Sequence, residues 1–211
     1  MTKLLFENLH TFLPLPEMLA GKLEIPVIKA TSCIPTQVSG CIGFNYAMSC
    51  KTPGSMGVHF FLDDAQFIRL WNSPDRYIPM LSKFGYLCSP DFSTYSDMPK
   101  ALQIYNHYRK HWLGAYWQAL GLTVIPTISW STPDSFEWCF DGEPEGGVVA
   151  IGTAGTQGSK ASRAAFLAGY NAMLERLHPC EVLLFGKYPE GISGNVRFMG
   201  NPAAQRFGRE A

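Results

Sequence analysis

The sequence predicts an α/β protein in which mostly parallel strands alternate with helices. Its strongest strand candidates, residues 147–151 and 180–185, are continuous apolar runs, the pattern of strands that are covered on both faces of a parallel sheet. Segments with helical periodicity separate several of the strand candidates, as βαβ units require. Hydrophobic residues make up 46% of the 211 residues, which is enough for a large core.

The predicted strands share apolar or β-branched residues bounded by Gly, Pro, Asp or Ser. They cover residues 25–29, 58–62, 86–88, 122–128, 147–151, 180–185 and 195–198. The Cys- and Gly-rich segment 32–56 is predicted to be irregular.

The predicted helices cover residues 65–71, 76–83, 99–120, 133–140 and 159–177. Asp64 is placed to cap the first of them with its carboxylate. In the longest helix, apolar residues recur at steps of three and four, and Gly121 follows its end. The face that carries Tyr105, Tyr108, Trp112 and Tyr116 is therefore predicted to lie in the core.

This order of elements favours a (β/α) barrel, complete or incomplete, with an open doubly wound sheet as the alternative. Pro and polar residues at several strand ends favour the barrel, although 211 residues is short for a full one. We expect one α/β domain over residues 25–200, an N-terminal extension over 1–24 and a C-terminal tail over 201–211.

Composition argues against two classes of partner. Lys plus Arg and Asp plus Glu number 17 each, whereas proteins that bind nucleic acid through its phosphates usually carry a basic surplus. No run of about 18 apolar residues predicts a membrane span, and the N-terminal residues lack the continuous apolar region of a signal peptide. We therefore expect a cytoplasmic protein, and its six scattered cysteines are expected to be free thiols.

Several segments together resemble DUF4417, a domain of unknown function found in bacteria, phages and other mobile elements. The segments are Ile25-Pro26, Phe60-Phe61-Leu62-Asp63-Asp64, Ser89-Pro90-Asp91-Phe92-Ser93, Ile128-Ser129-Trp130-Ser131 and Gly152-Thr153-Ala154-Gly155. The family has no assigned activity, so the resemblance implies a phage, plasmid or bacterial context and no mechanism.

Two aspartates are the candidate catalytic residues. Asp64 and Asp91 each follow an apolar strand, and α/β proteins bind ligands beyond the carboxyl ends of their strands. Two carboxylates there could hold a divalent cation or share acid–base work. A helix cap for Asp64 and a turn at Asp91 are the structural alternatives.

Five further residues at strand ends are candidate ligand contacts. Trp130, after Ser129, could stack on a base or a sugar, or it could pack in the core. Thr153 and Gly155 lie in a Gly-rich loop before a helix, where backbone N–H groups could bind an anion. The loop lacks the Gly-Lys pair of a Walker motif. Lys187 could supply a counter-charge, or it could be a solvated surface lysine.

His107 and His111 lie four residues apart on the longest predicted helix, a spacing that allows both to chelate a metal. No acidic residue lies between them, and Arg109 and Lys110 add positive charge. These residues are therefore predicted to form a polar helix face, and the sequence leaves any metal ligands undetermined.

Three functions remain open. The first is an enzyme or binder of a small phosphorylated or nucleotide-like anion, with a divalent metal as a conceivable cofactor. The second is a non-enzymatic accessory protein of a mobile element that binds a host or phage protein. The third is a factor in phage or plasmid nucleic-acid replication, which the neutral charge disfavours.

Overall fold

The computed structural model describes residues 19–202, so most of the predicted N-terminal extension and C-terminal tail lie outside the described residues. The strands are short and follow the predicted order along most of the chain. They are β1 (Leu19–Ala20), β2 (Ile25–Pro26), β3 (Gly40–Gly43), β4 (Met56–His59), β5 (Tyr86–Cys88), β6 (Val124–Ile125), β7 (Val148–Gly152), β8 (Glu181–Phe185) and β9 (Val196–Phe198).

The strands form two larger sheets and a small hairpin. One sheet has the order β3-β4-β5-β6 and the other β7-β8-β9, and every neighbouring pair in both is parallel. A parallel bridge between Thr127 and Ala150 brings the end of the β6 segment beside β7. The protein is therefore an α/β fold with mostly parallel sheets, as predicted.

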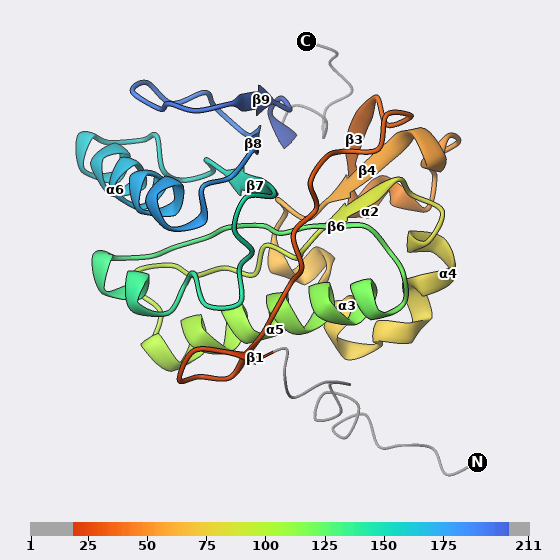
Figure 1. Ribbon diagram of the computed structural model, residues 1–211, viewed down its shortest axis with the longest axis horizontal. Helices are drawn as coiled ribbons and strands as arrows, with labels where there is room; N and C mark the ends of the chain where they lie inside the picture. The colour runs from red at the N-terminus through yellow and green to blue at the C-terminus, as the bar shows by residue number, and fades with distance from the viewer. Residues whose placement is uncertain (1–18, 203–211) are drawn as a thin grey trace.

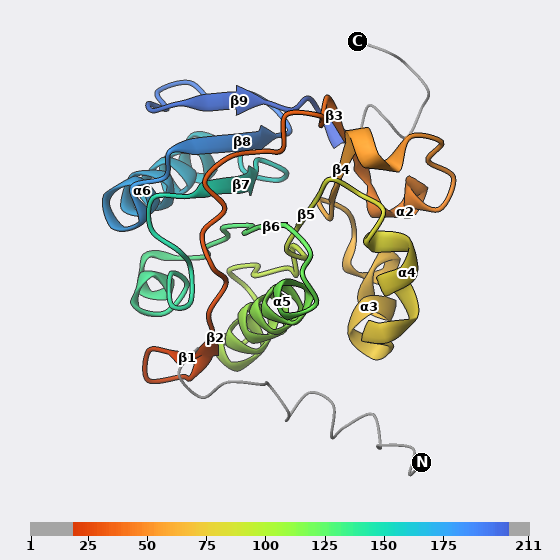
Figure 2. The same ribbon diagram turned by 45° about the vertical axis from the view of Figure 1, so that its right-hand side comes forward.

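The sheets do not close into a barrel. Within residues 19–202, β3 and β9 are not hydrogen-bonded to each other. Figure 2 shows β3 to β9 following one another along an arc, with helices on its outer side. Side chains from distant strands still meet inside the arc, because the ring centroids of His59 in β4 and Phe185 in β8 are 5.0 Å apart.

Within residues 19–202 the two long helices match the predicted ranges to within one residue at each end. They are α5 (Lys100–Ala119) and α6 (Lys160–Leu177), and the short ones are α2 (Phe44–Ala47), α3 (Ile68–Asn72) and α4 (Ile78–Leu81). The 3₁₀ turns of the described residues are η2 (Pro53–Ser55), η3 (Asp64–Gln66), η4 (Pro74–Tyr77) and η5 (Pro133–Glu137). The helix predicted over 133–140 is only such a turn, whereas α2 and η2 lie in the segment 32–56 predicted to be irregular. Figure 1 shows α6 beside β7 and β8, and α5 below β6 in this view.

The predicted first strand does not belong to the parallel sheets. Ile25–Pro26 pairs only with β1, in an antiparallel hairpin. The edge strand of the first sheet is instead Gly40–Gly43, in the segment predicted to be irregular. Its sequence, Gly-Cys-Ile-Gly, has two glycines, which are rare in strands, so local propensity does not reveal it.

Half of the buried residues of α5 are polar, which corrects the prediction for this helix. Tyr105 is 44% exposed, and Tyr108 and Tyr116 are only partly buried, although Trp112 lies in the core as predicted. The buried stripe that recurs at helical spacing is Gln103, Asn106, His107, Lys110, His111 and Gly114. Polar side chains tolerate such burial only when they find hydrogen-bond partners.

Helix α6 covers the outer face of β7 and β8. Its N-terminus is closed by a capping box, in which Ser159 and Ser162 each bond the other's backbone N–H, an arrangement that satisfies orphan N–H groups. Phe166, Tyr170 and Met173 of the helix pack with Val149 and Leu184 of the strands. No helix within residues 19–202 has the length and apolarity needed to cross a bilayer.

Candidate functional site

Asp64 lies past the end of β4 and binds the chain that follows β5. Its Oδ1 accepts the Ser93 hydroxyl at 2.9 Å, and both carboxylate oxygens lie 3.3 Å from the Ser93 backbone nitrogen, which donates to them. The predicted role as a helix cap is wrong, because Asp63 holds the N-terminal flanking position of η3 and no side chain caps it. Asp64 instead connects two neighbouring strand ends.

Asp91 lies beyond the end of β5, close enough to Asp64 for their charges to interact. Burial raises the pKa of the Asp91 carboxyl to about 7; Lys110 opposes this rise and the negative charge of Asp64 adds to it. The residue as a whole is partly exposed. The two predicted carboxylates thus lie within electrostatic range of each other, and a carboxyl with a pKa of about 7 gains or loses a proton near neutral pH.

Helix α5 holds the loop that carries Asp91 and Ser93. Asn106 donates from Nδ2 to the Ser93 carbonyl at 2.5 Å, and the Arg109 guanidinium lies 4.0 Å from the centroid of the Phe92 ring. Arg109 also donates to the Asn106 side chain. A cation over an aromatic face is attractive, so these contacts hold the chain that directly follows Asp91.

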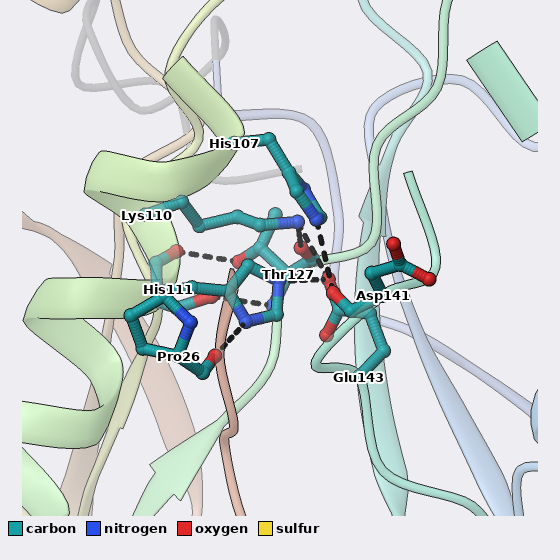
Figure 3. Close-up of polar contacts among 8 residues, drawn as sticks. Pro26, His107, Lys110, His111, Thr127, Asp141 and Glu143 are labelled. Atoms are coloured by element: carbon teal, nitrogen blue, oxygen red, sulfur yellow. Dashed lines mark hydrogen bonds and ion pairs between the residues drawn. The ribbon is translucent and has the colours of Figure 1, made fainter. Parts of the chain in front are cut away.

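A buried ion pair lies behind the strand ends. Lys110 is 1% exposed, and its Nζ donates to Glu143 Oε1 at 2.6 Å and to the Thr127 carbonyl at 2.8 Å. Thr127 donates two hydrogen bonds to Ser89 at the ends of β6 and β5, from its backbone N–H to the Ser89 hydroxyl and from its own hydroxyl to the Ser89 carbonyl. Figure 3 shows Lys110 reaching from α5 toward Glu143 and Thr127. Lys110 therefore connects α5, the β6 end and the loop before β7.

Both histidines of α5 enter the same buried cluster, so the predicted polar helix face does not point to solvent. His107 Nε2 lies 3.0 Å from the Asp141 carbonyl oxygen. His111 Nδ1 lies 2.8 Å from the Pro26 carbonyl oxygen, and its Nε2 lies 2.9 Å from Glu143 Oε1. Burial lowers the pKa of each histidine, most strongly at His107.

Gly142 permits the close approach of this loop. Its φ of +77° is in the left-handed region, and a Cβ there would lie 2.7 Å from the Pro26 carbonyl oxygen and 2.9 Å from His111 Nδ1. Only glycine adopts this conformation and leaves this space at low cost. The glycine thereby sets the position of the Glu143 carboxylate next to α5.

Thr153 and Lys187 lie side by side at the ends of β7 and β8. The Thr153 hydroxyl donates to the Lys187 carbonyl at 2.9 Å, and Thr153 is buried, whereas Lys187 is exposed. Gly155, in the loop that follows, is exposed with a φ of +74°. Thr153 thus positions the backbone of Lys187, and both Gly155 and Lys187 are exposed at this end.

Trp130 packs against α6. Its ring centroid is 5.4 Å from that of Phe166, and a Cβ on Gly169 would lie 2.2 Å from its indole Nε1. Both Trp130 and the preceding Ser129 are partly buried. These contacts favour the core-packing alternative for Trp130 over stacking on a ligand.

Sequence reasoning missed three residues of this region: Lys110, Glu143 and His59. Lys110 and Glu143 lie 33 positions apart, and His59 is a buried residue at the end of β4 whose ring lies near those of Phe61 and Phe185. One signal was available, because the polar residues of α5 recur at steps of three and four. That stripe indicates a buried polar face as well as an exposed one.

Comparison with known proteins shows that the chain is similar to two phage proteins. The model of the domain of unknown function DUF4417 matches residues 17–200. The "Gene 1 protein" of Mycobacterium phage D29 is 41% identical over 164 residues, and that of Mycobacterium phage L5 is 39% identical over 165 residues. The match covers 78% of this chain in both cases, but only 60% of the D29 protein and 71% of the L5 protein. No solved structure matches.

Proposed function

Because this chain belongs to the DUF4417 family, a domain of unknown function, we propose a role from its own geometry: it binds and processes a small phosphorylated or nucleotide-like ligand beside Asp64 and Asp91. The two carboxylates at the ends of neighbouring parallel strands carry this proposal. In α/β folds this edge of the sheet is where ligands bind.

Asp91 is the proposed proton-transfer group. A carboxyl with a pKa of about 7 holds its proton in part of the molecules at neutral pH, which suits general acid–base catalysis. The positive charge of Lys110 stabilises the ionised form of the Asp91 carboxyl. Asp64, held by Ser93, would position the ligand directly or through a divalent cation, for which carboxylate oxygens are the preferred ligands.

Lys187 and the Gly155 loop are the proposed contacts for the anionic part of the ligand. Both are exposed at the same carboxyl edge of the sheets. A lysine ammonium binds phosphate as a point charge, and a Gly-rich loop before a helix presents backbone N–H groups. The charge of the ligand would then lie between Lys187 and a cation held by Asp64.

The test measures binding and turnover with defined probes. Inorganic phosphate and nucleoside mono-, di- and triphosphates, each with and without Mg²⁺, are added to the wild-type protein, and the thermal midpoint and product release are recorded. A binding probe at 100 times its Kd should stabilise the fold by about 2.7 kcal/mol. Asp91→Asn should abolish turnover while the circular dichroism spectrum is unchanged.

The matched control is Asp97→Asn, since Asp97 is an exposed carboxylate in the same segment and should leave turnover unchanged. Full turnover in Asp91→Asn would eliminate the catalytic role of Asp91. Absence of any thermal shift with the whole panel would refute ligand binding at this edge.

A further inference from the structure

Three metal-ligating side chains meet inside the protein, away from the exposed strand ends. His107 and His111 lie one turn apart on α5, and Glu143 lies in the loop before β7. One ligand atom from each side chain can be chosen so that all three atoms lie within 4.8 Å of one another. The three side chains are at most 2% exposed. The site is therefore enclosed by protein, and its three side chains would leave one position of a tetrahedral zinc ion for a water molecule.

The hydrogen bonds of the two histidines determine which ring nitrogens are available. A carbonyl oxygen only accepts, so His107 donates Nε2–H to Asp141 and His111 donates Nδ1–H to Pro26. In the neutral rings, the lone pairs then belong to His107 Nδ1 and His111 Nε2. Metal-binding histidines are typically oriented in this way by a backbone carbonyl on the second nitrogen.

Glu143 has one carboxylate oxygen that is bound and one that is not. Oε1 accepts from Lys110 and lies 2.9 Å from His111 Nε2. Oε2 is buried and has no hydrogen-bond partner among residues 19–202. A buried carboxylate oxygen without a hydrogen-bond partner lowers the stability of the fold. His111 Nε2 and Glu143 Oε1 are both acceptors in this arrangement, so their short separation requires a proton or a cation between or beside them.

We propose that His107, His111 and Glu143 bind one divalent transition-metal ion, with Zn²⁺ as the preferred ion. Imidazole and carboxylate are the donor types that bind zinc, and thiolate is not required. Glu143 would supply Oε2, because Oε1 is held by Lys110. The metal would tie α5 to the loop before β7 and thereby hold Lys110 beneath Asp91. This inference does not depend on the proposed ligand.

The surrounding charges can accommodate the ion. Lys110 adds one positive charge beside the site, which weakens binding of a cation. The carboxyls of Asp141 and Asp91 interact electrostatically with His111 and Lys110, respectively. Together with Glu143 they supply three negative charges when ionised, which offset the ammonium and a divalent ion.

The experiment measures metal content and metal spectroscopy on the untagged full chain. We expect one zinc per chain by elemental mass spectrometry after dialysis. We also expect the visible absorption of tetrahedral cobalt when Co²⁺ is added to protein stripped with a chelator. His107→Gln keeps a donor for the Asp141 carbonyl but removes the ring nitrogen, and it should lower metal affinity roughly tenfold or more. Glu143→Gln should do the same.

Two controls separate this site from other causes. His178→Asn changes an exposed histidine and should retain one metal per chain. Asp91→Asn should also retain it, so loss of the proposed function and loss of the metal can be told apart. Lys110→Met, which removes the competing ammonium, should bind zinc more tightly than the wild type. Folded wild-type protein that holds no zinc and gives no cobalt absorption would overturn the proposal and leave a proton-sharing ion cluster.

Discussion

The ammonium Nζ of Lys110 lies 2.6 Å from Oε1 of Glu143, and the two side chains are 1% and 0% exposed. An ion pair in such an enclosed place forms a net favourable interaction only when both groups have further partners. Lys110 has the Thr127 carbonyl and Glu143 has His111. This pair joins the long helix to the loop before β7.

Lys110→Met should destabilise the protein by about 3–5 kcal/mol, because it leaves the buried Glu143 carboxylate without its ammonium. The free energy of unfolding in urea is the measurement. Adding Glu143→Gln to this variant should restore part of the loss, since contacting residues are not additive. Lys100→Met breaks a pair whose side chains are 51% and 61% exposed and should change little. An equal effect of the two lysine variants would contradict the buried pair.

The stability of the wild-type protein should fall between about pH 4 and pH 7 through Asp91. In this window the unfolded chain has released the Asp91 proton, whereas the folded chain, with a pKa of about 7, still holds it. Raising the pH therefore favours unfolding, by at most about 1.4 kcal/mol per pH unit. Besides burial, the groups that act on Asp91 are Lys110, which opposes the rise of its pKa, and Asp64, which adds to it. The buried Cys88 thiol near Asp91 stays neutral in this window, because its own pKa is raised.

Asp91→Asn removes this titration, so its stability relative to the wild type should increase as the pH rises through that window. Urea unfolding at closely spaced pH values tests the expectation, with Asp97→Asn as the control for an exposed carboxylate. A constant difference between Asp91→Asn and the wild type across the window would show that Asp91 titrates normally.

Asp64→Asn should lower the pKa of Asp91 from about 7, because the negative charge of Asp64 contributes to that value. Asparagine keeps an oxygen that can accept from the Ser93 hydroxyl, so the loop should stay in place. Carboxyl ¹³C NMR titration of Asp91 measures the shift. Asp97→Asn should leave the Asp91 titration where it is, and a similar shift in both variants would point to a general charge effect.

Gly169→Ala should destabilise the protein by about 1–3 kcal/mol, as overpacking does. The added Cβ would lie 2.2–2.4 Å from three atoms of the rigid Trp130 indole. This clash outweighs the gain of up to about 1 kcal/mol that alanine brings to a helix interior. Asn171→Ala, at an exposed position of the same helix, should be neutral or slightly stabilising.

Tryptophan fluorescence supplies a second measurement, since the Gly169→Ala substitution should move the Trp130 ring. A stable Gly169→Ala protein with unchanged fluorescence would mean that Trp130 is free to leave α6. That result would revive Trp130 as a stacking surface for a ligand.

The strands with continuous apolar runs could be predicted from the sequence, because a strand that is buried on both faces has apolar residues at successive positions. Residues 86–88 form β5 as predicted, β7 is shifted by one residue from the predicted range 147–151, and β8 begins one residue later than predicted. Gly40–Gly43 could not be found in this way, because its place beside β4 comes from hydrogen bonding to that strand and from its own Ile42. The sheets remain open because β3 and β9 do not pair within the described residues, a property that no single segment encodes.

For the candidate site too, the sequence could nominate individual residues, whereas only the fold decided their contacts. Asp64 and Asp91 could be nominated from their positions after apolar strands, but their mutual interaction depends on the parallel pairing of β4 and β5. Asp64 looks like a helix cap in the sequence and instead binds Ser93, 29 positions away. A local pattern cannot distinguish these roles, since an Asp before a helical segment fits both.

The sequence alone determined the α/β class, the order of most strands and the two long helices, because apolar runs and helical periodicity are properties of neighbouring residues. Only the tertiary structure decided that His107, Lys110 and His111 face inward. Charged and polar side chains are stable inside a protein only when partners surround them. Here those partners are Pro26, Thr127, Asp141 and Glu143, which folding brings to one place from separate parts of the chain.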